Sequence, residues 1–371
     1  MDNERLSIIS LNTIVELVPK KFISLVDYFG SANNIINADI KELESVGLPN
    51  DVAKSIKNLS DFKVANNELT LAEKSNIKVL TYLDKEYPYQ LKNICDYPPV
   101  IYVKGIFDKN DNLSVSVVGS RRPTNYGLVV TEKFCKYFAQ NSITTISGLA
   151  GGIDAQAHSS TLKNSGRTIA VLGNGLLECY PASNKKLQTE IGEKGVVISE
   201  FPLTKKALPM NFPRRNRIVA ALSLATIVIE AAQKSGSLIT ANLACDYGKD
   251  VFAVPGPVFS KYSQGPNSLI KQGAFVATTP EDVIEQVSLL TDWVKKKAKK
   301  NKKEIEKNLP LISQSSINIL KMIQSSATGM SLDEISLKSD VNVSEVSLIL
   351  LDLELNGLIK AMPGQIYVRN T

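Results

Sequence analysis

The chain has 371 residues, of which 43% are hydrophobic and 22% charged, as in ordinary globular proteins of two or three domains. Its formal net charge of +6 is accounted for by residues 295–307, which contain eight lysines and two glutamates. The rest of the chain sums to zero, so overall basicity does not indicate a polyanionic partner, and only local clusters of charge can do so.

Secretion and membrane insertion are not indicated by the sequence. The first residues lack the basic start and apolar core of a signal peptide, and the most apolar run, residues 218–232, is interrupted by polar side chains and is too short to span a bilayer. The four cysteines, Cys95, Cys135, Cys179 and Cys245, have no CxxC spacing. We therefore expect a cytoplasmic protein with reduced cysteines, no metal site and no membrane partner.

Residues 1–65 are expected to form a small helical module. The stretch at 42–59 has two helical patterns around Gly47, which resembles a helix-hairpin-helix unit. Hairpin amides in such units can contact a phosphate, but here Glu42, Glu44 and Asp51 flank the hairpin. A packing or interaction module is therefore favoured over DNA contact. Residues 66–110 contain strand-like runs broken by prolines and lead into the next domain.

A series of β-branched apolar runs begins after residue 112, and helical patterns separate them. Such near-continuous runs are typical of strands buried on both faces, and hence of a parallel sheet with helices on either side. The runs occupy residues 113–119, 142–148, 167–173, 195–201, 224–231 and 250–256. We predict an α/β fold, a Rossmann-like doubly wound sheet at about 110–288, within a domain of residues 66–290 that includes the lead-in.

The C-terminal part divides into a charged connector and a third module. Like charges in the lysine-rich segment, residues 291–309, predict an extended or solvated linker, although weak phosphate contact stays open. Residues 310–371 contain three helical patterns, a capping box of Ser331 and Glu334, and alternation around Pro363 and Gly364. This is the layout of a winged helix.

Ligand-binding loops are expected after the strands of the central domain, at the carboxyl edge of the sheet. The first, 119–124, offers free amides, a hydroxyl and two guanidinium groups to a phosphate through Gly119, Ser120, Arg121 and Arg122. It is not a GxGxxG dinucleotide fingerprint. Ion pairing within the protein is the alternative role for the two arginines.

The second loop, 147–158, places Gly148, Gly151 and Gly152 at a helix start, where backbone amides favour an anion. Asp154 and His158 lie four residues apart on the same helix. Further metal ligands and a nucleophile-elbow motif are lacking, so a structural histidine is the expectation. The third loop, 173–181, either lines a pocket or only reverses the chain.

The fourth loop belongs to a stretch, residues 201–229, that contains no Asp or Glu. Cations at a helix start oppose the helix dipole, and bound anions would relieve that cost. An aromatic ring beside arginines is a combination used on single-stranded nucleic acid. The candidates are Lys205, Lys206, Phe212, Arg214, Arg215, Asn216 and Arg217. The alternative is a core phenylalanine beside a solvated basic turn.

The fifth loop predicts a phosphate site at a helix N-terminus, formed by Ser235, Gly236 and Ser237 with Thr240 one turn later. Asn267 and Lys271 are weaker candidates at the same edge. Together the loops supply phosphate-binding groups but no evident general base, metal cage or activated nucleophile. This balance favours binding of an extended phosphodiester over enzymatic turnover, with no cofactor.

Several of these segments resemble, in order, the motifs of the DNA processing protein A family, also called DprA or Smf. The segments are "VVGSRRPTNYG", "SGLAGGIDAQAH", "AVLGNGL", "ISEFP", "NFPRRNRIVAALS", "VIEAAQKSGSLITA" and "VFAVPGP". The flanking modules resemble the SAM-like or helix-hairpin-helix domain and the winged helix that some members carry.

The resemblance implies a non-enzymatic homodimer, formed through the Rossmann-like domain. It would bind and protect single-stranded DNA and load the RecA recombinase during natural transformation or related recombination. The family's phosphate-binding positions would be Gly119, Ser120, Arg121, Phe212, Arg215, Asn216, Arg217, Ser235, Gly236 and Ser237, with Lys205 and Lys206 nearby.

Two further hypotheses remain. A phosphoribohydrolase-like nucleotide-processing enzyme would share the sheet and glycine loops, but its PGGxGT stretch is absent. A duplex-binding regulator would use the winged helix, but residues 343–356 contain Glu345, Asp352 and Glu354 and no Lys or Arg. Because duplex phosphates would repel that helix, we expect the module to mediate protein interaction or dimerisation.

Overall fold

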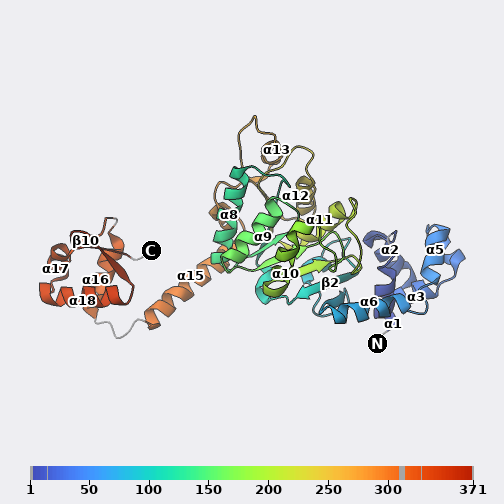
Figure 1. The fold of residues 1–371 in the computed structure, drawn as a ribbon, viewed down its shortest axis with the longest axis horizontal. Helices are drawn as coiled ribbons and strands as arrows, with labels where there is room; N and C mark the ends of the chain where they lie inside the picture. The colour runs from blue at the N-terminus through green and yellow to red at the C-terminus, as the bar shows by residue number, and fades with distance from the viewer. Residues whose placement is uncertain (1–2, 15, 309–313, 327, 370–371) are drawn as a thin grey trace. The chain divides into compact units, whose positions relative to one another are not determined.

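The computed structural model describes residues 3–14, 16–308, 314–326 and 328–369 (Figure 1). The chain divides into two compact units, Met1–Lys295 and Lys296–Thr371. Within the described residues, no helix is both long and apolar enough to cross a membrane.

The first unit begins with a helical bundle. Its helices are α1 (Asn3–Leu11), α2 (Pro19–Phe29), α3 (Ala32–Asn37), α4 (Ile40–Ser45), α5 (Asn50–Lys57) and α6 (Lys63–Lys74). The expected module boundary at residue 65 falls inside α6. The amides of Gly47 and Leu48 donate to the carbonyls of Glu44 and Leu43 at 2.9 and 3.3 Å, which caps α4. These two hairpin amides are therefore engaged within the protein, and the packing role of this module stays a prediction.

The central sheet has nine strands over the described residues, in the order β1-β2-β6-β5-β4-β3-β7-β8-β9. The strands are β1 (Lys78–Thr81), β2 (Val100–Gly105), β3 (Ser114–Val118), β4 (Thr144–Ser147), β5 (Thr168–Val171), β6 (Val196–Ser199), β7 (Ala225–Val228), β8 (Asp250–Ala253) and β9 (Phe275–Val276). β2 pairs antiparallel with β1 and β6, and the strands from β6 to β9 pair in parallel. All six predicted strands are confirmed; the short β9 was not predicted.

Helices cover both faces of the sheet, as expected for strands with buried residues on both sides. They are α7 (Tyr89–Lys92), α8 (Asn125–Gln140), α9 (Ile153–Lys163), α10 (Lys185–Lys194), α11 (Asn211–Leu222), α12 (Gly236–Asp246), α13 (Gln264–Lys271) and α14 (Pro280–Gln286), with 3-10 turns η1 (Lys109–Asn112) and η2 (Ala182–Asn184). Phe134 of α8 and Ala157 of α9 pack with Val117 on one face, whereas Ile218 of α11 and Ala241 of α12 pack on the other.

The strand order reverses between β3 and β7. From β3 the chain adds β4, β5 and β6 on one side and later β7, β8 and β9 on the other. In an open α/β sheet, the loops diverge at such a switch point and leave a crevice at the carboxyl ends of the strands. The predicted doubly wound fold is confirmed, and its topology places a binding crevice beside the loops after β3 and β7.

The predicted linker is largely helical: α15 (Ser288–Asn308) continues through the lysine-rich run. Lysine, alanine and glutamate have high helix propensity, and the segment contains no proline or glycine before residue 310. This local preference prevails over the like-charge repulsion from which an extended segment was expected. Residue 309 and residues 310–313 of the expected third module lie outside the described residues.

The second unit has a three-helix and small-sheet arrangement. After the last part of α15, it contains α16 (Gln314–Ser325), β10 (Met330–Ser331), α17 (Leu332–Ser339), α18 (Val343–Leu355), β11 (Ile359–Met362) and β12 (Ile366–Arg369), with sheet order β10-β12-β11. The predicted capping box is confirmed: Ser331 Oγ accepts from Glu334 N at 3.3 Å, and the Glu334 carboxylate accepts from Ser331 N at 2.9 Å. The turn between β11 and β12 forms the expected wing.

Candidate nucleic-acid interface

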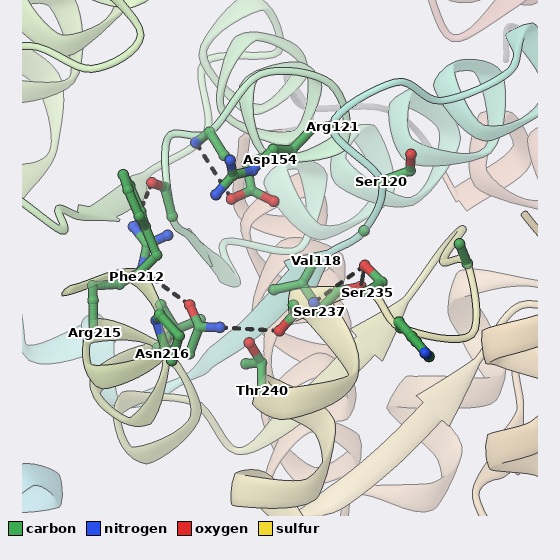
Figure 2. Close-up of a pocket in the computed structure, with 18 of the residues that line it drawn as sticks. Val118, Ser120, Arg121, Asp154, Phe212, Arg215, Asn216, Ser235, Ser237 and Thr240 are labelled. Atoms are coloured by element: carbon green, nitrogen blue, oxygen red, sulfur yellow. Dashed lines mark hydrogen bonds between the residues drawn. The ribbon is translucent and has the colours of Figure 1, made fainter. Parts of the chain in front are cut away.

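A pocket of about 540 Å³ lies at the switch point. The loops after β3, β4 and β7 and the start of α11 line it, and Figure 2 shows ten of the side chains by name. The lining includes these predicted site residues: Gly119, Ser120, Arg121, Gly148, Phe212, Arg215, Asn216, Ser235, Gly236, Ser237 and Thr240. Groups from four separate sequence segments therefore surround one space.

The loop after β3 forms one wall of the pocket. Ser120 N donates to the carbonyl of Glu230 at 2.6 Å, which joins this loop to the loop after β7. A Cβ at Gly119 would lie 2.7 Å from Ile153 and 2.9 Å from the Glu230 carbonyl, so only glycine fits there. Beyond these fixed residues the exposed Arg121 lies over Phe212, with its guanidinium carbon 5.1 Å from the ring centroid. The backbone thus holds Arg121 at the mouth of the pocket.

Two aromatic rings form the next part of the wall. The centroids of Phe212 and Tyr180 are 5.4 Å apart with an interplanar angle of 47°. A Cβ at Gly173 would come within 2.9 Å of Phe212, so this glycine makes room for the ring. Partly exposed rings next to a cation are suited to stack on nucleobases. The third loop, whose role the sequence left open, contributes Tyr180 to the pocket.

Arg215 forms the floor. Its side chain is only 4% exposed, and Nη1 donates to the carbonyls of Gly148, at 2.5 Å, and Val171. A Cβ at Gly148 would lie 2.4 Å from the guanidinium, so the glycine leaves space for it. Burial lowers the pKa of Arg215 to about 10 despite attraction from Asp154, so the group is still protonated at neutral pH. A desolvated, permanent positive charge therefore lies under the pocket.

The N-terminus of α12 forms the opposite wall. Ser235 Oγ accepts from Ser237 N at 3.4 Å, and the two hydroxyls are 2.7 Å apart. Asn216 Nδ2 donates to the carbonyl of Gly236 at 3.0 Å and ties α11 to this turn (Figure 2). The positive end of the helix dipole and the hydroxyls favour an anion such as phosphate.

The charge of the described lining is predominantly positive. It includes the cations Arg121, Arg215 and Lys234 against one carboxylate, Asp154. Burial raises the pKa of Asp154, although Arg215 lowers it in part. Asp154 is buried beside Arg215, whereas the cations Arg121 and Lys234 are exposed, so the accessible charge of the described lining is positive.

Arg214 and Arg217, predicted as DNA contacts, do not line this pocket. Arg217 is 4% exposed and its Nη2 donates to the buried Glu200, while Arg217 Nε lies 3.7 Å from Asp96. Arg214 Nη2 is 3.3 Å from the same Glu200 carboxylate. Glu200 and Asp96, which lie outside the acid-free stretch, therefore neutralise part of the arginine run, and the predicted DNA contacts of Arg214 and Arg217 stay predictions.

Other candidates also lie outside the described lining. Lys205 and Lys206 border a second depression, next to Glu68 of α6. Arg122 is exposed on the β3 loop, and its backbone amide donates to Ser120 Oγ at 3.1 Å. A Cβ added at Gly151 would lie 3.8 Å from the Arg121 carbonyl oxygen, which is an ordinary van der Waals distance. None of these residues belongs to the pocket lining.

Asn267 and His158 have internal partners. Asn267 Nδ2 donates to the carbonyl of Gly256 at 3.0 Å, and Gly256 N donates to Asn267 Oδ1 at 3.3 Å. His158 is fully buried in α9, and its Nδ1 lies 2.7 Å from Thr168 Oγ1. Burial, with a contribution from Arg215, lowers the His158 pKa to about 3, so the ring is neutral. This environment is that of a structural histidine.

Sequence reasoning missed three contributors. Tyr180 and Lys234 line the pocket, and the signals were an aromatic residue in the loop after β5 and a cation directly before Ser235. The buried Glu230 accepts from Thr124 N at 2.8 Å and from Thr124 Oγ1 at 2.5 Å, at the start of α8. Its role in joining the β3 and β7 loops required the sheet topology, which the sequence alone did not fix.

A switch-point crevice with glycine-rich loops, a serine-capped helix N-terminus and clustered cations defines a Rossmann-like anion-binding domain. The chain belongs to the family described as DNA recombination-mediator protein A, whose model matches residues 78–288. A second model, the DprA winged helix domain, matches residues 317–365. The resemblance and the winged-helix prediction are thereby confirmed.

Relatives support this membership over most of the chain. Protein Smf of Escherichia coli strain K12 is 37% identical over 313 residues, which cover 83% of this chain and 81% of the relative. DNA processing protein DprA of Streptococcus pneumoniae strain ATCC BAA-255 / R6 is 43% identical over 204 residues, or 55% of this chain and 72% of the relative.

Solved structures agree with the fold. The X-ray structure of DprA from Streptococcus pneumoniae has a TM-score of 0.66 at 32% identity and covers 77% of this chain and 98% of that one. A Helicobacter pylori structure, described as giving insights into the unique single-stranded DNA binding mode of DNA processing protein A, has a TM-score of 0.52 at 31% identity, with 58% and 96% covered.

Proposed function

We propose that this chain binds single-stranded DNA in the switch-point pocket and acts as a recombination mediator without turning over its ligand. The observation that carries the proposal is the convergence of Arg121, Arg215, Phe212 and the Ser235–Ser237 turn on one space. The relation to the Helicobacter pylori protein, whose structure concerns single-stranded DNA binding, supports it. A flexible strand can place both a phosphate and an unstacked base in such a pocket, whereas a duplex keeps its bases paired.

Each group has a distinct role in this proposal. The α12 N-terminus and Arg121 bind backbone phosphates, and Phe212 with Tyr180 stacks a base. Arg215 keeps the floor positive and holds the Gly148 loop in place through its carbonyl contacts. Lys234 at the rim attracts the incoming strand.

Changing the charge of Arg121 tests this assignment. Arg121→Glu should weaken binding of a fluorescent oligothymidylate by more than tenfold and reduce the slope of log affinity against log salt concentration. Arg122→Glu makes the same charge change at the neighbouring residue outside the lining and should have a much smaller effect. Binding is measured by anisotropy with single- and double-stranded DNA over a range of salt. Equal losses in the two variants, or preference for duplex, would contradict the proposal.

A phosphoribohydrolase-like activity is the alternative, and the pocket's Asp154 is the observation in its favour. Its pKa is raised by burial, as in some catalytic carboxylates. However, its Oδ2 already accepts a bond from Ala150 N at 3.4 Å and it lies close to the Arg215 charge. Release of free base from nucleoside monophosphates, lost in Asp154→Asn, would establish the enzyme; no release favours the binding function.

We further propose that the bound strand is protected and handed to RecA, in natural transformation or a related recombination process. Homodimerisation through the Rossmann-like domain is part of this proposal. Strand β9 is supported as a pairing edge because it ends the sheet and both Phe275 and Val276 are exposed. The dimer is tested by comparing the sedimentation of the wild-type full chain with that of the full chain carrying Val276→Asp. The loading is tested by measuring RecA-dependent strand exchange on DNA that is already coated with a single-strand-binding protein, with and without this chain.

For the winged helix we propose protein interaction or dimerisation rather than duplex recognition. Three leucines, Leu348, Leu351 and Leu355, are exposed along one side of α18, and Glu345 and Asp352 lie on the same helix. An apolar and acidic surface suits a protein partner and disfavours phosphates. The test is to measure duplex DNA binding at physiological salt by the full chain carrying Arg121→Glu, in which the pocket is impaired. Duplex binding that persists in this variant would contradict the proposal.

A further inference from the structure

The loop after β8 leaves the sheet at the same edge as the pocket. β8 pairs in parallel with β7, whose own loop lines the pocket. The chain next to α13 projects beyond the surrounding helices in Figure 1. At the tip of this loop Val258 and Phe259 are 75% and 98% exposed. Phe259 is the most exposed of the large apolar side chains over the described residues, and Val258 lies beside it at the same tip.

The first end of the loop is held rigidly. The Tyr126 hydroxyl donates to the Pro255 carbonyl at 3.1 Å. Asn267 binds both the amide and the carbonyl of Gly256, at 3.3 and 3.0 Å. Such double contact fixes the direction in which the chain leaves β8.

The second end is fixed to the pocket itself. Ala231 N donates to the Tyr262 carbonyl at 2.7 Å, and Gly265 N donates to the Ala231 carbonyl at 2.9 Å. Ala231 directly precedes Ala232 and Lys234 of the pocket lining. Residues 257–261 therefore protrude from a base that is joined to the rim.

The chemistry of the tip matches that of the pocket wall. Beside the exposed Phe259, Lys261 holds its ammonium 5.0 Å from the Tyr262 ring centroid. Exposed rings interleaved with cations are the combination that binds single strands through base stacking and phosphate contact.

We propose that Phe259 stacks on a base of the strand as it leaves the pocket past Lys234, and that Lys261 binds a neighbouring phosphate. The binding site then extends beyond the pocket along the sheet edge, and Asn267 is a positioning residue that holds the loop. This inference rests on the proposed single-stranded DNA binding.

Strand length separates the loop from the pocket. With the full chain, Phe259→Ala should weaken binding of an oligothymidylate of about twenty nucleotides by roughly tenfold, the range of one lost stacking contact. Binding of one of about six nucleotides, which fills only the pocket, should change less than about twofold. Phe259→Tyr keeps an aromatic ring and should restore the long-strand affinity. Val258→Ala, at the same tip but without a ring, is the matched control.

The outcomes distinguish the two proposals. If Phe259→Ala binds the long strand like the wild type while Arg121→Glu loses both strands, the loop inference is overturned and the pocket function stands. If the wild type binds neither strand, both fail. A changed sedimentation coefficient in Phe259→Ala with unchanged affinity would assign the tip to contact between copies and overturn the inference.

Discussion

Two buried arginines of helix α11, Arg215 and Arg217, lie in different environments. Arg215 and Arg217 are both 4% exposed. Arg215 donates to the neutral carbonyls of Gly148 and Val171 under the pocket, whereas Arg217 meets the carboxylates of Glu200 and Asp96. Arg215 is attracted by one nearby carboxylate, Asp154, whereas Arg217 makes ion pairs with both Glu200 and Asp96. Under the proposed function, these two residues, which are two apart in sequence, serve binding and stability separately.

Breaking the Glu200 region should have the largest effect on stability. Glu200→Ala leaves Arg217 buried without its main counter-charge, and the free energy of unfolding should fall by about 3–5 kcal/mol. Urea denaturation measures this change. Glu193→Ala, an exposed glutamate on α10, is the control. A loss below about 1 kcal/mol would show that the ion pair is not important for the fold.

Crowding the Arg215 floor should have an intermediate effect. In Gly148→Ala the added methyl overlaps the guanidinium, so unfolding free energy should drop by about 1–3 kcal/mol and strand affinity should fall as well. Gly151→Ala, with only an ordinary contact at 3.8 Å, should leave both quantities nearly unchanged. Equal behaviour of the two variants would mean that Arg215 moves aside without cost.

The buried His158 sharpens the comparison through pH. Because its folded pKa of about 3 lies below the ordinary 6.5, the unfolded state binds the proton first. This histidine therefore makes stability decrease by up to about 1.4 kcal/mol per pH unit as pH falls below 6.5. The raised pKa of Asp154 acts in the opposite direction. Subtracting the unfolding profile of His158→Asn from that of the wild type isolates the histidine, and a flat difference between pH 5 and 6.5 would contradict its neutral burial.

The smallest effect is expected at Arg122, which is exposed beside the pocket. Arg122→Ala should change strand affinity by about twofold or less and leave the unfolding free energy within about 0.5 kcal/mol. Anisotropy and urea denaturation measure both. A tenfold loss of affinity would extend the interface outward along the β3 loop.

The sequence predicted the six strands and the pocket loops because buried parallel strands have continuous apolar runs and share one edge for their carboxyl ends. It could not assign Arg217, since one of its partners, Asp96, is distant in the chain. It also misjudged the lysine-rich segment, where local helix propensity prevails over repulsion. Asn267 was identified as a site residue, yet its side chain serves Gly256. Charge and residue type predicted where ligand groups gather, but only spatial neighbours decide which remain available.

Glu230 joins the two halves of the sheet at the point where they diverge. Its carbonyl accepts from Ser120 N and its carboxylate from Thr124, so the loops after β3 and β7 are fastened to each other before any ligand arrives. These two loops are thus ordered when the protein folds. On association, the loss of conformational entropy should therefore come mainly from the nucleic acid. If the proposed function holds, the two loops that meet the strand are held together in advance by Glu230.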